Sequence, residues 1–275
     1  MFKKHKIIQY IEDKHLKDGG YMFAKVEPSG GLDTYHAIQI LKMLGTKPKY
    51  PESIRDFFLE LEEHEGIDDI VGLYLTVETF KELGYEVARF HSYKTVLDKE
   101  KNDLGGFGTI KELYIEATSE LQTTYESIVV AQDLSYHLDK QKLKHFILSL
   151  QNVDGGFGTH QLSLLPTTHY ALASLNELGI AHDGKEAINY LREKEKKIGG
   201  FYLEELYWCV TNLHMLKQKP IDIDGILAFL QDCFRDNGGF CRSRNMGIST
   251  FEDTFYAVTL LNVLESYGVP VFDKK

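Results

Sequence analysis

Five Gly-Gly-aromatic triplets recur along the chain and constrain its fold more than any other feature. They are Gly19-Gly20-Tyr21, Gly105-Gly106-Phe107, Gly155-Gly156-Phe157, Gly199-Gly200-Phe201 and Gly238-Gly239-Phe240. A short amphipathic segment lies on one side of each triplet and a more apolar segment on the other. Glycine tolerates positive φ angles, so a Gly-Gly pair allows a sharp turn between two helices. The repeat therefore predicts a series of helical hairpins.

A sixth pair of segments lacks the triplet but keeps the helical pattern, over residues 53–66 and 67–84. Six helical pairs suit either an open solenoid or a closed ring. An open solenoid needs polar capping repeats at its ends, whereas the last repeat here is among the most regular and most aromatic. We therefore predict an all-α fold, an α/α toroid or (α/α)6 barrel, in which six inner helices surround a central cavity.

No linker, low-complexity tract or change of composition interrupts the repeats, so residues 1–275 are expected to form one toroid domain. The net charge of −10 argues against a nucleic-acid partner, which needs clustered Lys and Arg. Three cysteines without CxxC spacing indicate reduced thiols. The chain starts without a signal-peptide pattern and has no apolar run of transmembrane length, so a cytoplasmic location is expected.

The second segments share polar positions near their starts. We align them on one apolar position, which is Leu41 in the first repeat and Val77 in the second. The column eight residues earlier contains Asp33, Asp69, Thr123, Thr167, Glu205 and Asp253, and the column before it adds Asp68 and Glu252. Asp and Thr at a helix start are typical N-caps, which explains a single polar residue at this place.

Paired acids are harder to explain as caps, because a cap needs only one carboxylate. Asp68-Asp69 and Glu252-Asp253 each place two side by side. Like-charge repulsion raises one pKa of such a pair and can create a proton donor or a cation site. These four acids are therefore candidate catalytic residues, with N-capping as the alternative. Glu204-Glu205 is a third pair of this kind.

Aromatic residues follow the polar columns, five and six residues before the alignment position. They are Tyr35-His36, Tyr125, His169-Tyr170, Tyr207-Trp208 and Phe255-Tyr256; the second repeat has Val71-Gly72 there, and Glu126 follows Tyr125. Such rings pack in a core or line a cavity. In a ring of six helices some would surround one central space, where aromatic faces stabilise a cation or bury an apolar ligand. These residues, apart from Val71, Gly72 and Glu126, are candidate substrate-binding residues.

Arg242 and Arg244 lie in the loop before the last inner helix. They could bind an anionic group such as a diphosphate, because guanidinium groups match its geometry. The alternative is that they are exposed loop residues.

Two stretches carry a family resemblance. QNVDGGFG followed by PTTHYALASLNELG, and LQDCFRDNGGFC followed by FEDTFYAVTLL, resemble the repeats of protein prenyltransferase β subunits and class II terpene cyclases. The resemblance covers essentially the whole chain. It implies an α/α toroid whose aromatic-lined cavity holds an isoprenoid chain, and, as for prenyltransferase β subunits, a possible helical α-type partner.

The resemblance also implies positions for catalytic groups. Tyr202, Glu204 and Asp253 lie where protein prenyltransferases have their Asp, Cys and His zinc ligands. Without the thiolate and the imidazole, a metal site of Glu204, Glu205 and Asp253 favours Mg²⁺ or Mn²⁺ over zinc. The sequence from Gly66 to Asp69 is the nearest match to the D-x-D-D motif of class II cyclases, with Asp68 at the protonating position.

The sequence thus predicts an isoprenoid-handling enzyme, either a prenyl transferase or a cyclase. Two alternatives remain. One is a carbohydrate-active enzyme, since paired carboxylates and aromatic platforms also suit sugars. The other is a non-catalytic toroid that binds a lipid or a protein, which the missing zinc ligands support.

Overall fold

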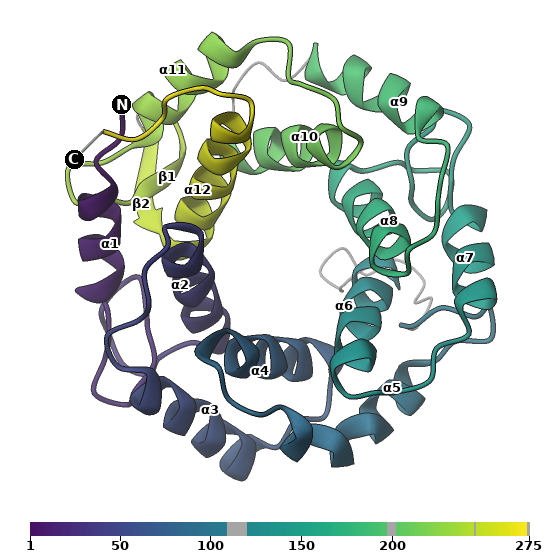
Figure 1. Ribbon diagram of the computed structural model, residues 1–275, viewed down its shortest axis with the longest axis horizontal. Helices are drawn as coiled ribbons and strands as arrows, with labels where there is room; N and C mark the ends of the chain where they lie inside the picture. Colours follow the sequence, from purple (N-terminus) through teal and green to yellow (C-terminus); the bar gives the residue numbers. More distant parts are fainter. Residues whose placement is uncertain (109–119, 197–201, 245, 274–275) are drawn as a thin grey trace.

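The computed structural model describes residues 1–108, 120–196, 202–244 and 246–273, and its helices form two concentric layers (Figure 1). The inner layer consists of α2 (Gly31–Met43), α4 (Ile70–Leu83), α6 (Glu120–Asp133), α8 (Leu165–Glu177), α10 (Leu203–Met215) and α12 (Phe251–Ser266). The outer layer consists of α1 (Lys4–Glu12), α3 (Pro51–Glu65), α5 (Lys94–Glu100), α7 (Lys140–Ser149), α9 (Lys185–Glu195) and α11 (Ile223–Cys233), with the 3₁₀ helix η1 (Ala88–Tyr93) before α5. The predicted α/α toroid is confirmed.

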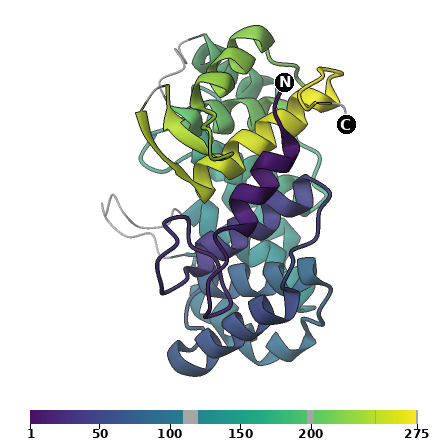
Figure 2. The ribbon, with the colours of Figure 1, turned by 90° about the vertical axis from the view of Figure 1, so that its left-hand side faces the viewer.

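The ring is closed, because the last inner helix α12 packs on the first, α2. The two chain ends lie side by side in both views (Figures 1 and 2). The N–H of Phe2 donates to the carbonyl of Val271 at 2.8 Å, and the N–H of Asp273 donates to the carbonyl of Phe2 at 3.1 Å. The Tyr10 hydroxyl in α1 also donates to the carbonyl of Ser249 at 2.9 Å. The open solenoid is thereby excluded.

Each inner helix is buried around most of its circumference, whereas an outer helix buries one face. The outer helix α1 buries Ile7, Tyr10 and Ile11, while α12 buries ten residues from Phe251 to Leu264. This agrees with the more charged character of the first segment of each pair. Among the described residues, no helix combines the length and apolar character that crossing a bilayer needs.

The Gly-Gly pairs are required by the packing of one repeat on the next. Gly238 has φ +93°, and a Cβ there would lie 2.2 Å from the carbonyl oxygen of Lys6 in α1. At Gly106 a Cβ would lie 2.2 Å from the ring of Phe146 in α7. The first glycine therefore supplies a left-handed turn, and at Gly106, Gly156 and Gly239 the second glycine leaves room for an aromatic ring from an outer helix. The triplet from Gly199 to Phe201 lies outside the described residues.

The aromatic residue of each described triplet is tied to the next inner helix by the same hydrogen bond. Its backbone N–H donates to a threonine hydroxyl, from Tyr21 to Thr34 (2.9 Å), Phe107 to Thr124 (3.0 Å), Phe157 to Thr168 (3.0 Å) and Phe240 to Thr254 (3.1 Å). All four threonines are fully buried. This contact sets the position of each inner helix relative to its turn.

A short antiparallel hairpin, β1 (Phe240–Ser243) and β2 (Met246–Thr250), precedes α12 and was not predicted. Its register is irregular between Cys241 and Ser243. Strands this short, without a run of alternating apolar residues, give little periodic signal.

Candidate functional site

A cavity of about 470 Å³ lies between the inner helices, and each helix contributes three lining residues. They are Leu32, Tyr35 and His36; Val71, Tyr74 and Leu75; Gln122, Tyr125 and Glu126; Pro166, His169 and Tyr170; Glu204, Tyr207 and Trp208; and Glu252, Phe255 and Tyr256. In every helix the three positions are i, i+3 and i+4, which lie on one face. All nine predicted substrate-binding residues of the inner helices line this cavity.

The repeated pattern corrects the sequence alignment of α4. That helix begins at Ile70, so its second residue is Val71, just as Glu252 is the second residue of α12. The sequence alignment on Val77 therefore placed this repeat three residues out of register. The residue equivalent to Tyr35 and Phe255 is Tyr74, which the sequence analysis missed.

The rings on the six inner helices form a continuous belt around the cavity. Neighbouring ring centroids are 5.7 Å apart for Tyr35–Tyr74, 6.3 Å for Tyr74–Tyr125, 5.7 Å for Tyr125–Tyr170, 5.6 Å for Tyr170–Trp208, 6.0 Å for Trp208–Tyr256, 6.0 Å for Tyr256–Phe255, 5.0 Å for Phe255–His36 and 5.8 Å for His36–Tyr35. These distances are typical of favourable ring pairs. The belt is therefore a single aromatic surface to which all six repeats contribute.

Both histidines of the cavity are neutral at physiological pH. Burial lowers the pKa of His36 to about 4, and its ring stacks on Phe255. Burial also lowers the pKa of His169 to about 4, against the opposing effect of its hydrogen bond with Asn212 (3.1 Å). Neither ring therefore supplies a positive charge to the cavity.

Glu126 is the most unusual residue of the cavity, and the sequence analysis did not select it as a site residue. It is 5% exposed, and burial raises its pKa to about 7, although the hydrogen bond from Gln122 (2.9 Å) opposes the rise. Within the described residues its Oε2 atom has no hydrogen-bond partner. The available signal was a carboxylate in a column where four of the five other repeats have rings.

Two further carboxylates, Glu204 and Glu252, line the cavity from the first turns of α10 and α12. Trp208 Nε1 donates to Glu204 Oε1 at 3.5 Å, and the Tyr256 hydroxyl donates to Glu252 Oε1 at 3.0 Å. Each acid is thus held by a ring of the belt one turn further along its own helix.

Asp253, by contrast, does not line the cavity. The N-cap of α12 is Thr250, which accepts from the N–H of Asp253 at 3.0 Å and donates its hydroxyl to Asp253 Oδ2 at 2.8 Å. Burial raises the pKa of Asp253, and the bond from Thr250 opposes the rise. The N-cap predicted at Asp253 is therefore wrong: Thr250 is the cap, and Asp253 supports it from the first turn.

Asp68 and Asp69 are both exposed and lie before α4. Asp69 is the N-cap of that helix, accepting from the N–H of Gly72 at 2.7 Å. In α4 the residues that correspond to Glu252 and Asp253 are Val71 and Gly72, so Asp68 and Asp69 lie three residues before them. The structure thus does not bring Asp68 and Asp69 together with the other predicted acids, and their catalytic role stays a prediction.

The remaining predicted residues lie outside the cavity. Arg242 is exposed and lies over the ring of Tyr202, 4.8 Å from its centroid. Arg244 faces the outer helix α11, where its Nη1 is 3.5 Å from Asp232 Oδ2. Glu205 is exposed. Their predicted contacts with a diphosphate or a metal find no support in these positions.

The predicted zinc positions do not fit zinc. Tyr202, Glu204 and Asp253 offer neither thiolate nor imidazole, the donors that zinc prefers besides carboxylate. In the part of the chain that the structure describes, no three His, Cys, Asp or Glu side chains are placed to hold a metal ion together. The site of Glu204, Glu205 and Asp253 for Mg²⁺ stays a prediction.

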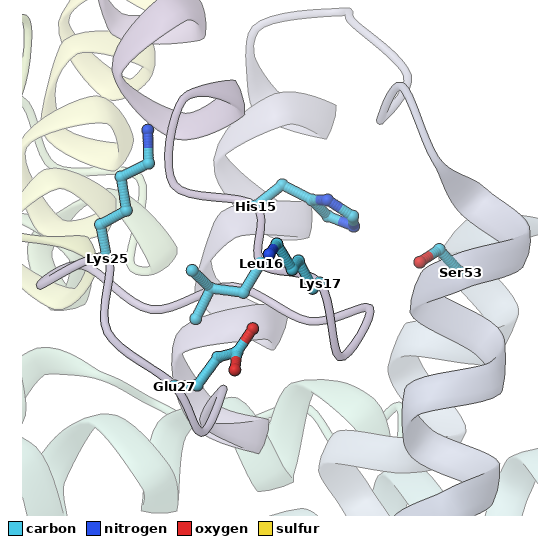
Figure 3. A pocket seen from close by; sticks show the side chains of 6 residues that line it. All are labelled: His15, Leu16, Lys17, Lys25, Glu27 and Ser53. Carbon is cyan, nitrogen blue, oxygen red and sulfur yellow. The ribbon is translucent and has the colours of Figure 1, made fainter.

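A second cavity, of about 520 Å³, lies outside the ring of inner helices, between the loop after α1 and the helix α3. Figure 3 shows its lining, in which the ring of His15 points toward Ser53 while Lys25 and Glu27 lie on the other side. It is open to solvent and has no aromatic belt, so the central cavity is the stronger candidate site.

Comparisons with known proteins agree with the fold. The sequence model of the family described as prenyltransferase alpha-alpha toroid domain matches residues 2–203 and 185–274. The geranylgeranyl transferase type-1 subunit beta of Arabidopsis thaliana is 23% identical over 238 residues, which are 75% of this chain and 61% of that protein. This chain thus spans about three fifths of the length of that curated relative.

Solved structures share the fold at low sequence identity. Protein geranylgeranyltransferase-I of Candida albicans, complexed with GGPP, has a TM-score of 0.73 and 15% identity, covering 96% of this chain and 92% of that chain. The type II terpene cyclase MstE of Scytonema, in its apo form, has a TM-score of 0.61 and 12% identity, covering 96% and 97%. At these identities the likeness concerns the fold.

Proposed function

Because this chain belongs to the prenyltransferase alpha-alpha toroid domain family, we propose that it handles isoprenoids and holds a prenyl chain in its central cavity. The belt of rings on the six inner helices is the observation that carries this proposal. A volume of about 470 Å³ lies in the range of small-molecule sites, which are lined mainly by apolar and aromatic groups. The relatives, which include a geranylgeranyl transferase subunit and a terpene cyclase, give further support.

We further propose that the protein is an enzyme whose chemistry begins with proton transfer to the prenyl chain. Glu126 supports this, because a pKa of about 7 leaves its carboxyl substantially protonated at neutral pH. The aromatic belt would stabilise the cation that protonation of an alkene creates. Glu252, at the start of α12, is the predicted catalytic acid that lines the same cavity. We assign to it the role of the base that removes a proton at the end of the reaction.

The binding proposal is tested with geranylgeraniol, an uncharged prenyl chain. Trp208 is the only tryptophan and lines the cavity, so its fluorescence reports occupancy directly. We expect a saturable change that Tyr170→Ala weakens at least tenfold, since Tyr170 contacts both Tyr125 and Trp208. Glu63→Gln, an exposed position on the outer helix α3, is the matched control and leaves binding unchanged. Absence of a saturable change would refute the proposal.

Turnover separates an enzyme from a binding protein. Geranylgeraniol, farnesyl diphosphate and geranylgeranyl diphosphate are incubated with the protein, with and without Mg²⁺, and products are identified by mass spectrometry. We expect a product that Glu126→Gln abolishes and Glu252→Gln reduces. If Asp68→Asn abolished it instead, the reaction would be assigned to the exposed acids before α4. Binding without any product would favour the non-catalytic toroid.

A helical α-type partner belongs to the proposal as well. The curated relative is described as a subunit, which supports it. Native mass spectrometry of protein isolated from its own host tests this, and a monomer as the only species would count against it. The carbohydrate-active alternative draws no support from the family match.

A further inference from the structure

The charges that line the central cavity have one sign. Glu126, Glu204 and Glu252 all face it, and none of the described lining residues is a lysine or an arginine. Both lining histidines are neutral, because burial lowers each pKa to about 4. Among the described lining residues, a diphosphate in this cavity would therefore meet carboxylates and no lysine or arginine.

The nearest basic side chain of the last repeat is directed elsewhere. Arg242 is exposed and covers the ring of Tyr202, and its charge lowers the pKa of Asp253, which does not line the cavity. Arg244 is paired with Asp232 on the outer helix α11. Neither arginine is among the described residues that line the cavity.

Glu126 has hydrogen-bonding capacity that the described residues do not use. Its Oε1 accepts from Gln122, while Oε2 is buried and unpartnered. Leaving a buried acceptor unpaired is unfavourable by about 1–3 kcal/mol, and more for a charged group. A ligand with a donor at this place would remove the penalty, and a cationic donor would also stabilise the ionised carboxylate.

The rings beside Glu126 suit the same kind of ligand group. Tyr125 and Tyr170 lie on neighbouring helices at 5.7 Å, and Trp208 continues the row 5.6 Å from Tyr170. Aromatic faces attract organic cations within about 6 Å, tryptophan most strongly. Carboxylates and ring faces together form the usual surroundings of a bound ammonium group.

We propose that the ligand of this cavity carries a protonated amine on its apolar chain, held by Glu126 and the neighbouring rings, and does not carry a diphosphate. The inference rests on the proposed function for the apolar part of the ligand only. It adds the chemical class of the head group, an ammonium ion, which the three acids and the aromatic belt of the cavity would bind. A Glu126 carboxylate that is paired with an ammonium group has no proton to donate, so with such a ligand Glu126 binds the head group and is not the proton donor.

Three probes with one C20 chain test the head group. Geranylgeranylamine, geranylgeraniol and geranylgeranyl diphosphate are titrated against the protein at pH 8, with and without Mg²⁺, and Trp208 fluorescence reports binding. We expect the amine to bind at least tenfold more tightly than the alcohol, and the diphosphate at least tenfold more weakly than the alcohol. Diphosphate binding as tight as that of the alcohol would overturn the inference while leaving the prenyl site intact.

Variants show whether the carboxylates cause the preference. Glu126→Gln is expected to lower the ratio of amine affinity to alcohol affinity about tenfold, because it removes the charge that only the amine requires. Glu252→Gln, at an exposed residue of the first turn of α12, is expected to lower the same ratio severalfold. The control Glu63→Gln leaves the ratio unchanged. An amine preference that survives both cavity variants overturns the inference, and failure of all three probes to bind refutes the proposed function itself.

Discussion

At the scale of single residues, the chemistry of the cavity depends on one buried carboxyl. Glu126 lies in α6 among the rings of the belt. The groups around it are Gln122 on its own helix, Asp69 at the N-cap of α4, Tyr170 from α8 and Tyr35 from α2. None of these groups carries a positive charge. Burial therefore dominates, and the carboxyl holds its proton into the neutral range.

The raised pKa of Glu126 predicts how the stability of the protein changes with pH. Folding raises the pKa of Glu126 from 4.5 to about 7, so its contribution to stability is complete below pH 4.5 and is lost as pH rises through about 7. The loss is about 3 kcal/mol, at about 1.4 kcal/mol per pKa unit. Glu126→Gln has no proton to lose there. We therefore expect the difference in unfolding free energy, variant minus wild type, to increase by about 3 kcal/mol between pH 4.5 and pH 8.

Urea unfolding of both proteins across this range measures the difference. The contributions of His36 and His169, whose pKa values are lowered, change with pH in the opposite direction but cancel when the two proteins are compared. A difference that stays constant from pH 4.5 to pH 8 would show that Glu126 ionises normally.

At the scale of helices and turns, the repeat is defined by contacts that the sequence pattern could locate but not describe. The Gly-Gly-aromatic triplets indicated where each turn lies. They did not reveal that the second glycine receives a ring, such as Phe146 on Gly106, because that contact joins different repeats. The helix pair without a triplet is also the one whose register was predicted three residues out, and Tyr74 was missed for that reason.

Substitution of Gly106 tests the role of the second glycine. A Cβ at this position would lie 2.2 Å from the Phe146 ring. We expect Gly106→Ala to lower the unfolding free energy by about 1–3 kcal/mol, as overpacking does, and Phe146→Leu to restore part of the loss in the double variant. Gly30→Ala is the control, since its Cβ would come no closer than 3.7 Å to any atom and its φ is −103°. Equal losses at the two glycines would contradict this account.

The threonine that follows each turn gives a second test. Thr254→Val keeps the shape of the side chain but leaves the buried N–H of Phe240 without its acceptor. The expected loss of unfolding free energy is about 1–3 kcal/mol. Thr211→Val is a suitable comparison, because the Thr211 hydroxyl donates to carbonyls of its own helix, those of Tyr207 at 2.7 Å and Trp208 at 3.4 Å. Thermal unfolding of both variants should rank Thr254→Val as the less stable protein.

At the scale of the whole molecule, the sequence predicted the closed ring and its inner and outer layers. Because the six repeats are similar and the last helix is apolar, the first and last repeats can bury their apolar faces only against each other, which closes the ring. The carboxyl group of Glu126 stands in a column of rings in the sequence, yet its burial depends on the convergence of six helices. The short hairpin before α12 and the positions of Arg242 and Arg244 likewise follow from tertiary packing.

Closure makes a prediction about cooperativity. Phe2 is 3% exposed and packs on Phe234 and Phe240 at 5.5 and 5.6 Å, joining the first residues to the last repeat. We expect Phe2→Ala to destabilise the protein by about 3–5 kcal/mol and to shift the unfolding transition seen by Trp208, on α10. Met1→Ala, at a residue 68% exposed, should shift it little. A Trp208 transition that Phe2→Ala leaves unchanged would indicate an open array of repeats.

The most direct test of the central claim is a crystal structure of the protein grown with saturating geranylgeraniol. The account predicts electron density for the prenyl chain between the inner helices, in contact with Tyr74, Tyr170 and Trp208 of the aromatic belt. Density confined to the outer cavity at His15 and Lys25, or an empty central cavity under these conditions, would contradict it.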